Sequence, residues 1–142
     1  MDARPFPIEA RRGSGRTPSV ADAAPDLAAL LRDAAGRRLR CRVCGAVITG
    51  EGHRVEIAGG HVHRRVNPAG FEFELGCFDA AAGAAVVGPP TAEFSWFAGY
   101  AWSYSVCRAC GAHLGWYFEG GEGAFHGLIL NRLELESEVP ES

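Results

Sequence analysis

The sequence predicts one antiparallel all-β domain preceded by a short helix, and three observations support this prediction. The chain has 142 residues, a length typical of a single domain. From Arg40 onward, short segments rich in β-branched and aromatic residues alternate with Gly and Pro breaks. Two Cys-x-x-Cys-Gly motifs lie within this region, and such spacing is typical of metal-bound turns rather than disulfides.

The N-terminal 38 residues are expected to contribute little to the buried core. Residues 1–20 are rich in Pro, Gly and Arg and have few large apolar side chains, so we expect a flexible tail. Residues 21–38 contain good helix formers, and Asp26 is placed to cap their N-terminal end, so we expect a short helix or linker there. The folded domain is expected at residues 39–138.

Eight segments of this domain predict β-strands, because each is short, rich in β-branched or aromatic residues and bounded by turn signals. They are His53–Ala58, His61–Asn67, Gly70–Gly76, Ala84–Val87, Glu93–Phe97, Trp102–Val106, His113–Phe118 and a long final strand at Ala124–Glu136. Gly and Pro predict breaks at 59–60, 68–70, 88–90 and 120–121. Such short connections favour antiparallel neighbours.

Charge and hydropathy argue against several partners. The net charge is −3, and because Arg outnumbers Asp and Glu in the first 40 residues, the predicted domain itself is acidic. Nucleic acids are bound largely through Lys and Arg that pair with phosphates, so we expect no nucleic acid partner. No apolar run is long enough to cross a bilayer, and the N-terminus lacks the pattern of a secretory signal. We therefore expect a cytoplasmic protein without membrane contact.

The clearest chemical signal is the pair of motifs Cys41-Arg-Val-Cys44-Gly and Cys107-Arg-Ala-Cys110-Gly. A two-residue spacer lets both sulfurs reach one tetrahedral ion, and Gly tolerates the turn that follows. Four thiolates leave no open coordination position, so the motifs predict a structural Zn²⁺ rather than a catalytic one. A redox dithiol is the alternative. Cys77 lies outside both motifs and is interpreted as a small buried apolar residue.

An aromatic cluster surrounds the second motif. All three Trp residues of the chain lie in it, at positions 96, 102 and 116. Phe118 lies two residues after Trp116, so both are expected on the same face of a strand. Such a cluster either fills a core or forms a box for a cation or a flat neutral ring. A cation box usually includes a carboxylate, for which Glu93 is a candidate. The residues alone leave these alternatives open.

Four features of the sequence occur together. They are the segment FSWFAGYAWSYSVCRACGAHLGWYF at residues 94–118, VNPAG at 66–70, GPPT at 88–91 and the two cysteine pairs. Together these motifs resemble the CULT domain family, which includes the thalidomide-binding domain of cereblon. The resemblance covers about residues 38–136. It implies a β-tent, in which two antiparallel sheets set roughly at right angles are pinned at one edge by a structural zinc ion.

The resemblance also implies a binding site. In the family, three Trp residues form a cage around the glutarimide ring of thalidomide-type drugs, an aromatic residue forms its floor, and backbone groups hold the imide edge. The positions that match here are Trp96, Trp102, Trp116, Phe118, Phe94, Asn67 and Pro68. Animal cereblon has His at the position of Phe94, so a side-chain hydrogen bond from this position is not expected here.

These observations predict a small-molecule binding module for cyclic imides, with uridine-like compounds and C-terminal cyclic imides as further ligand candidates. A recognition domain for modified side chains or chain termini would use the same site. No ubiquitin-ligase adaptor is expected, because the ligase-docking parts of cereblon have no counterpart in this chain. The alternative is a β-tent enzyme of the methionine sulfoxide reductase B type. That reaction needs a nucleophilic Cys in the C-terminal strands, and no Cys follows Cys110, so we expect no enzyme.

Overall fold

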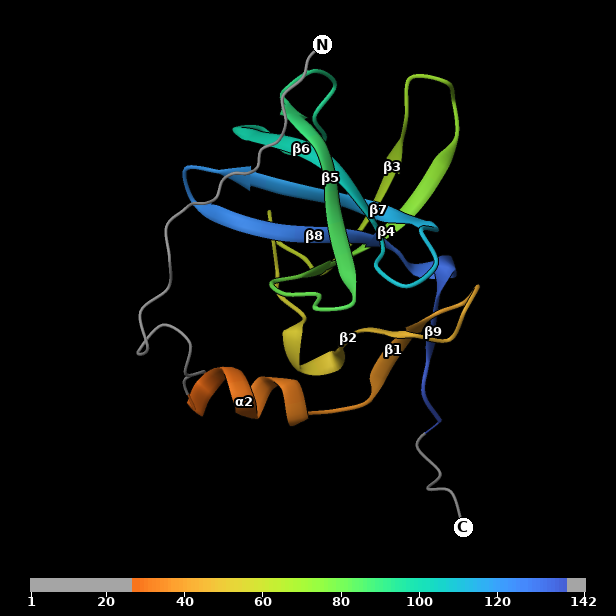
Figure 1. The fold of residues 1–142 in the computed structure, drawn as a ribbon. Helices are drawn as coiled ribbons and strands as arrows, with labels where there is room; N and C mark the ends of the chain where they lie inside the picture. Colours follow the sequence, from red (N-terminus) through yellow and green to blue (C-terminus); the bar gives the residue numbers. More distant parts are fainter. Residues whose placement is uncertain (1–26, 138–142) are drawn as a thin grey trace.

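The computed structural model describes residues 27–137, and in this part the predicted all-β class with two antiparallel sheets is confirmed (Figure 1). One sheet has three strands in the order β2-β1-β9, and the other has six in the order β3-β4-β8-β7-β6-β5. The tail expected at residues 1–20 lies outside the described residues. The domain boundaries proposed from the sequence stay a prediction.

The smaller sheet joins the two ends of the described chain. It consists of β1 (Arg38–Cys41), β2 (Val47–Gly50) and β9 (Leu133–Leu135). The larger sheet consists of β3 (Val62–Val66), β4 (Glu72–Phe78), β5 (Ala84–Thr91), β6 (Tyr100–Cys107), β7 (His113–Gly120) and β8 (Gly123–Ile129). The 3₁₀ helices η1 (Glu51–His53) and η2 (Leu130–Arg132) lie where the chain passes between the sheets.

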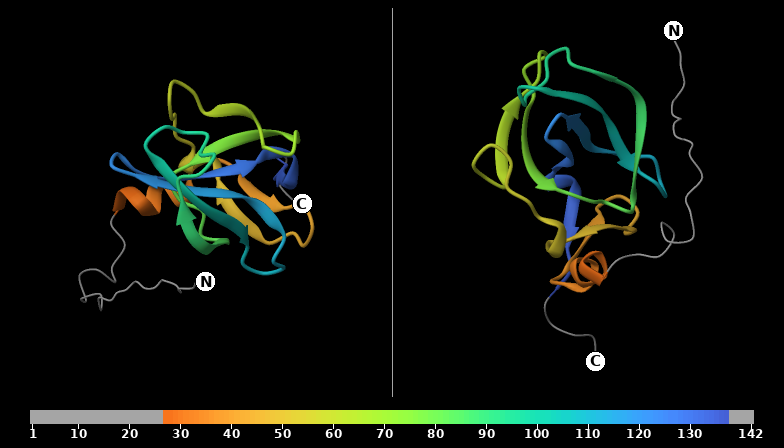
Figure 2. Two further views of the ribbon diagram at one scale, coloured as in Figure 1. Left: turned by 90° about the horizontal axis from the view of Figure 1, so that it is seen from above. Right: turned by 90° about the vertical axis from the view of Figure 1, so that its left-hand side faces the viewer.

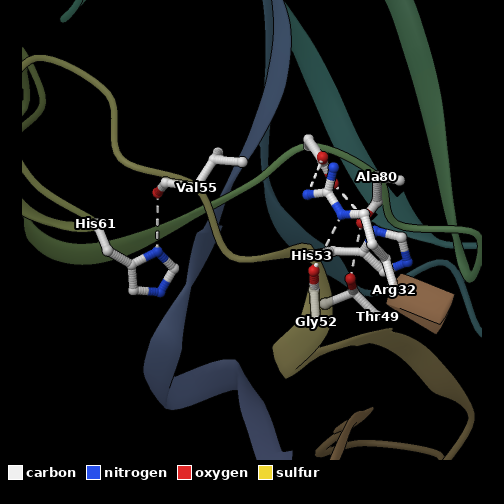
Figure 3. A network of polar contacts seen from close by, with 8 residues as sticks. Arg32, Thr49, Gly52, His53, Val55, His61 and Ala80 are labelled. Carbon is white, nitrogen blue, oxygen red and sulfur yellow. Dashed lines mark hydrogen bonds and ion pairs between the residues drawn. The ribbon is translucent and has the colours of Figure 1, made fainter. Parts of the chain in front are cut away.

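The short helix predicted within residues 21–38 is confirmed as α2 (Leu27–Ala34). Its Arg32 donates from Nε to the Gly52 carbonyl at 3.2 Å (Figure 3) and forms an ion pair with Asp79. The same carboxylate lies 3.0 Å from Nδ1 of His53, whose ring is buried. The helix is therefore anchored by polar contacts to η1 and to the segment that follows β4.

The larger sheet is strongly curled (Figure 2, right), and the segment after β5 reaches the end of β3. The indole N–H of Trp96, in the segment after β5, donates to the Val66 carbonyl at the end of β3 at 3.1 Å. β3 and β5 are the first and last strands in the sheet order, so this hydrogen bond spans from one edge of the sheet to the other. The curl creates the concave face that carries the aromatic residues described below.

Two buried clusters form the core. One lies where the sheets meet and contains Leu39, Ile48, Phe78, Leu114, Leu128 and Leu133 among its members. The other lies within the curl of the larger sheet and contains Leu75, Cys77, Phe97, Trp116, Phe118, Phe125 and Ile129. Trp116 and Phe118 are therefore core residues on one side and, as shown below, line a cavity on the other.

Two predicted strands are wrong. At His53–Ala58 the chain leaves η1 and makes isolated bridges from Arg54 and Ile57 instead of a continuous ladder. At Glu93–Phe97 it turns, because the Ser95 amide bonds back to the Ala92 carbonyl and Phe94 adopts a left-handed conformation (φ 58°). Both segments are irregular, although they contain the aromatic and β-branched residues that are typical of strands. Composition alone therefore does not distinguish them from strands.

Two predicted boundaries also differ from the structure. The break expected at 88–90 lies inside β5, where the ladder with β6 shifts register between Val87 and Thr91. β5 is an edge strand, where the missing N–H of Pro is tolerated. The long strand expected at Ala124–Glu136 is divided into β8, η2 and β9, because η2 redirects the chain from the larger to the smaller sheet.

The strands β1 and β2 were not among the predicted strands. They are short and flank the first cysteine motif. No helix among residues 27–137 is long and apolar enough to span a membrane.

Candidate functional site

The two cysteine motifs fold into turns of the same geometry. In each motif, the amide of the first Cys donates to the backbone carbonyl of the residue two positions after the second Cys. The amide of the Gly that follows the second Cys donates to the carbonyl of the first Cys. These bonds, all of 2.8 Å, are Cys41 to Ala46, Gly45 to Cys41, Cys107 to Ala112 and Gly111 to Cys107. Gly45 (φ 83°) and Gly111 (φ 80°) adopt the left-handed conformation, which explains the Gly in both motifs.

The four cysteine sulfurs converge on one point. All lie within 4.8 Å of one another, with 3.7 Å between Cys41 and Cys110 and 3.6 Å between Cys44 and Cys107. A tetrahedral ion with metal–sulfur bonds of about 2.3 Å requires sulfurs about 3.8 Å apart. The four residues can therefore hold a metal ion. Since Cys41 ends β1 and Cys107 ends β6, that ion would join the smaller sheet to the larger one.

Because the four thiols lie close together, the pKa of Cys110 is raised and that of Cys107 is lowered. The Ala112 amide lowers the pKa of Cys110, but burial and the neighbouring cysteines outweigh it and raise the pKa to about 12. For Cys107, burial raises the pKa, but the amides of Cys110 and Ala109 and the neighbouring thiols outweigh it and lower the pKa to about 7. A bound divalent cation would favour the thiolate form of all four.

Cys77 does not join this group. Its side chain is fully buried in the core within the larger sheet, and burial raises its pKa to about 11. A thiol with so high a pKa is a poor nucleophile at neutral pH, which agrees with its interpretation as an apolar residue.

The pairing of β6 with β7 builds one wall of a second site. Trp102 lies opposite Phe118 and Tyr104 lies opposite Trp116 in the antiparallel ladder. Residues directly opposite each other, and residues two apart on a strand, share one face of a sheet. The four aromatic side chains therefore stand together on the concave face of the larger sheet.

These residues line a cavity of about 390 Å³, which we call the aromatic cavity. Its lining residues are Asn67, Pro68, Phe73, Phe94, Trp96, Trp102, Tyr104, His113, Trp116 and Phe118. The seven ligand-binding positions predicted from the sequence are all among them. The structure thus brings together the loop after β3, the turn after β5, and the strands β4, β6 and β7.

The aromatic cavity has a buried floor and an exposed rim. Phe118 and Trp116 are 1% and 8% exposed, whereas Phe94 at the rim is 69% exposed. The rings of Trp96 and Trp116 meet nearly at a right angle (80°) with centroids 4.8 Å apart, so they form two adjoining walls. Trp102 packs edge to face against Tyr104 at 5.3 Å and extends the wall on β6.

Hydrogen bonds fix two of the indole rings. Trp96 donates to the Val66 carbonyl, as described above, and Trp102 donates from Nε1 to the Glu93 carbonyl at 2.7 Å. The side chain of Asn67 accepts a hydrogen bond from the Phe71 amide at 2.8 Å, which holds the loop between β3 and β4. The loops that form the rim are therefore tied to the walls and to each other.

Two residues of the cavity lining carry side-chain donors without a partner in the described part of the chain. Neither the indole N–H of Trp116 nor the amide NH₂ of Asn67 donates to another group among residues 27–137. Trp116 is buried, so an unpaired donor there favours a ligand that brings an acceptor. No carboxylate from the described part of the chain lines the cavity. Glu93 contributes its carbonyl to Trp102, and its side chain is not part of the lining.

The sequence did not identify three lining residues, namely Phe73, Tyr104 and His113. Tyr104 follows Trp102 by two residues, so strand alternation could have found it. The sequence pattern does not link Phe73 or His113 to the cavity. Phe73 lies on β4, far from the Trp residues in the sequence, and His113 lies at the start of β7, three residues before Trp116. Both contact Trp116, with centroid distances of 5.2 Å and 5.0 Å.

His113 is held in one neutral tautomer. Its Nε2 lies 2.9 Å from the Gly115 carbonyl, to which it donates, so Nδ1 is left as an acceptor. Burial lowers the pKa of His113, and the nearby Arg132 lowers it further. The ring therefore faces the aromatic cavity as an uncharged aromatic wall.

Comparison with known proteins places these features in a family context. No family model matches the chain. Cereblon from the frog Xenopus tropicalis is 38% identical over 81 residues, which cover 54% of this chain and 18% of the frog protein. Cereblon from chicken is 45% identical over 53 residues, or 37% of this chain and 12% of that protein. This chain contains a cereblon-like domain.

The cereblon-like domain matches only a small part of each of these relatives. Cereblon from the fruit fly Drosophila willistoni is 53% identical over 32 residues, which is 22% of this chain and 5% of the fly protein. The similarity therefore supports the domain, and it does not extend to the activity or partners of the whole cereblon protein.

Proposed function

We propose that the aromatic cavity of this cereblon-like domain binds cyclic imides of the glutarimide type. The observation that supports this most directly is the convergence of Trp96, Trp102 and Trp116 over the floor formed by Phe118. A cavity of about 390 Å³ lies at the lower end of the range for small-molecule sites, so it suits one small ring. Apolar walls favour the flat faces of such a ring by removing them from water.

The polar groups of the cavity match the edge of an imide. The free indole N–H of Trp116 and the free amide of Asn67 are donors, and an imide presents two carbonyl acceptors. In this proposal, backbone groups around Phe94 and Trp96 complement the imide N–H. A cationic ligand lacks acceptors for these donors and would find no carboxylate from residues 27–137 in the lining, so a cation box is disfavoured.

Zinc is the metal proposed for the four cysteines. Tetrahedral coordination by four thiolates is typical of structural zinc, and the fit of the sulfur distances supports it. In this proposal the ion has a structural role only, because its four ligands leave no position for substrate.

We further propose that the domain binds its ligand without chemical change. Catalysis of the methionine sulfoxide reductase B type requires an accessible nucleophilic thiol, and the cavity lining contains no Cys among the described residues. Cys77 is buried with a raised pKa. His113 has both ring nitrogens engaged, so it is poorly placed as an acid or base.

A titration of the intrinsic Trp fluorescence with glutarimide tests the proposal. We expect saturable quenching with an affinity near micromolar, which corresponds to about −8 kcal/mol. Trp96→Ala should abolish the response, because it removes one wall and the bond to Val66. Phe71→Ala is the matched control, since Phe71 is an exposed aromatic residue outside the lining and should leave affinity unchanged. An absence of quenching up to millimolar glutarimide would exclude the proposal.

Ligands larger than glutarimide are a second candidate, favoured by the exposed rim. Phe94 and Tyr104 are 69% and 45% exposed, and an apolar extension of the ligand would cover both. A peptide ending in a cyclic imide and free uridine are the probes that distinguish the candidates. Tighter binding of the peptide than of glutarimide would indicate recognition of chain termini, and tighter binding of uridine would indicate a nucleoside site.

A further inference from the structure

A second cavity lies beside the first cysteine motif. It has a volume of about 250 Å³, and three of its lining residues, Arg42, Arg132 and His113, carry nitrogen donors or acceptors. The rest of the lining consists of Cys41, Val43, Ala112 and Leu114. His113 lines this cavity and the aromatic cavity, so the two are separated by one residue. We call the second cavity the arginine pocket.

The main chain brings the two arginines together. The amide of Arg42 donates to the carbonyl of Arg132 at 3.1 Å, although the residues are far apart in the sequence. Arg42 follows β1 and Arg132 ends η2, the segment that carries the chain into the smaller sheet. Both side chains therefore start from adjacent points of the backbone and line one pocket.

Each guanidinium is anchored by a backbone carbonyl. Arg42 donates from Nη2 to the Leu133 carbonyl at 3.0 Å, and Arg132 donates from Nη1 to the His113 carbonyl at 2.9 Å. The same Nη1 of Arg132 lies 3.4 Å from Nδ1 of His113, the ring nitrogen left as an acceptor. A guanidinium has five N–H donors, so most donors of both groups stay free.

These two arginines differ from others of the domain in their partners. Arg32, Arg37 and Arg40 each form an ion pair with a carboxylate. Neither Arg42 nor Arg132 forms an ion pair within residues 27–137. No nitrogen of either group bonds to a cysteine sulfur in that part of the chain, so they do not serve the thiolates directly.

We propose that the arginine pocket binds one oxyanion group, a phosphate or a carboxylate. Two planar guanidinium groups with free donors match the oxygens of such a group through charge-assisted hydrogen bonds. Both arginines are exposed, so an anion can reach their free donors from solvent. This proposal does not depend on the binding of imides, because it uses a different cavity and different residues.

The experiment follows the Nε–H signals of ¹⁵N-labelled arginine in the full, metal-loaded chain during addition of inorganic phosphate or acetate. Ionic strength is held constant with sodium chloride. The chain has no Lys, so no lysine ammonium group competes for the anion. We expect saturable shifts of Arg42 and Arg132 at roughly millimolar anion. Tighter binding of phosphate would indicate a phosphate-bearing ligand, and tighter binding of acetate a carboxylate.

Variants decide whether the pocket is responsible. Arg42→Gln and Arg132→Gln should each weaken binding about tenfold or more, because each removes a charged donor. Arg64→Gln is the matched control, since it makes the same change at an exposed arginine on β3 outside the pocket and should have no effect. If Arg132→Gln does not fold, Arg132→Lys and Arg42→Gln serve in its place. Unchanged binding in the pocket variants, or no saturation by either anion, would overturn the proposal.

Discussion

The metal site and the aromatic cavity are built in opposite ways. Each cysteine motif is a short local turn, and the two turns repeat the same hydrogen bonds with the same Gly conformation. The aromatic cavity has no such repeat, because its lining comes from two loops and from β4, β6 and β7. The comparison teaches that each half of the four-cysteine site is encoded locally, whereas the whole lining of the aromatic cavity depends on how distant segments meet.

The two sites are nevertheless connected through the larger sheet. The second cysteine motif joins β6 to β7, and these strands carry Trp102, Tyr104, Trp116 and Phe118. Loss of the metal should therefore disturb the aromatic cavity. Changes within the cavity should leave the cysteine turns intact, because those turns close through their own backbone.

The largest expected effect follows from breaking the metal site. Cys44→Ser should abolish cooperative unfolding or lower the melting temperature strongly, because structural zinc contributes about 10 kcal/mol or more, comparable with the whole stability of a domain. Metal analysis and thermal unfolding followed by circular dichroism check this. Cys77→Ala is the control, since it removes a thiol outside the metal site and should retain the metal. A metal-free Cys44→Ser variant with unchanged melting would contradict the prediction.

A second test uses pH and concerns the larger sheet, which both sites share. His126 on β8 pairs with Tyr117, on the face of the sheet opposite the aromatic cavity. Burial lowers the pKa of His126 from 6.5 to about 4. Between these values the unfolded chain binds a proton that the folded chain does not, so the free energy of unfolding should fall as pH falls through this window. The full effect is about 3 kcal/mol.

Urea unfolding at a series of pH values measures this effect. His126→Asn keeps a polar group beside Ser105, whose Oγ lies 3.1 Å from Nδ1 of His126, and should show a smaller pH dependence. Both proteins have the same cysteines, so metal loss in acid affects both alike. Equal slopes in the two proteins would count against the prediction.

Trp102→Phe sharpens the comparison, because it keeps a ring but removes the bond to the Glu93 carbonyl. Glu93 is exposed, so water can replace this bond and the stability should fall by only about 1 kcal/mol. The affinity for glutarimide should fall about tenfold, because one wall is smaller and the rim loop is less well fixed. Chemical unfolding and fluorescence titration together check this, and an unchanged affinity would speak against a role for Trp102.

The smallest expected effect on stability is a gain. Phe94 combines a left-handed backbone (φ 58°) with a largely exposed side chain, so Phe94→Gly should raise the free energy of unfolding by about 0.5–1 kcal/mol. Ligand affinity should fall, because the rim loses its ring. Phe94→Ala removes the ring but keeps a Cβ, so it should lose affinity without gaining stability. A loss of stability in Phe94→Gly would show that the ring contributes to folding.

Part of the site was predictable because it depends on local chemistry. The Cys-x-x-Cys-Gly spacing carries the information for a turn, so the four cysteines that the structure brings together could be named from the sequence. Strand alternation placed Trp116 and Phe118 on one face, and the cavity lining agrees with that placement. The turn at Glu93–Phe97 was wrongly predicted as a strand, because its aromatic composition resembles that of β6 and β7.

The sequence by itself determined the four cysteines that could hold a metal ion, the all-β class and the gathering of Trp residues around the second cysteine motif. Only the tertiary structure decided that Phe73 and His113 line the aromatic cavity, that η2 moves the chain between sheets, and that Arg42 meets Arg132. The physical reason is the range of the interactions. Turns and strand faces follow from neighbouring residues. The aromatic cavity depends on the curl of the larger sheet, and the meeting of Arg42 with Arg132 depends on contact between distant segments.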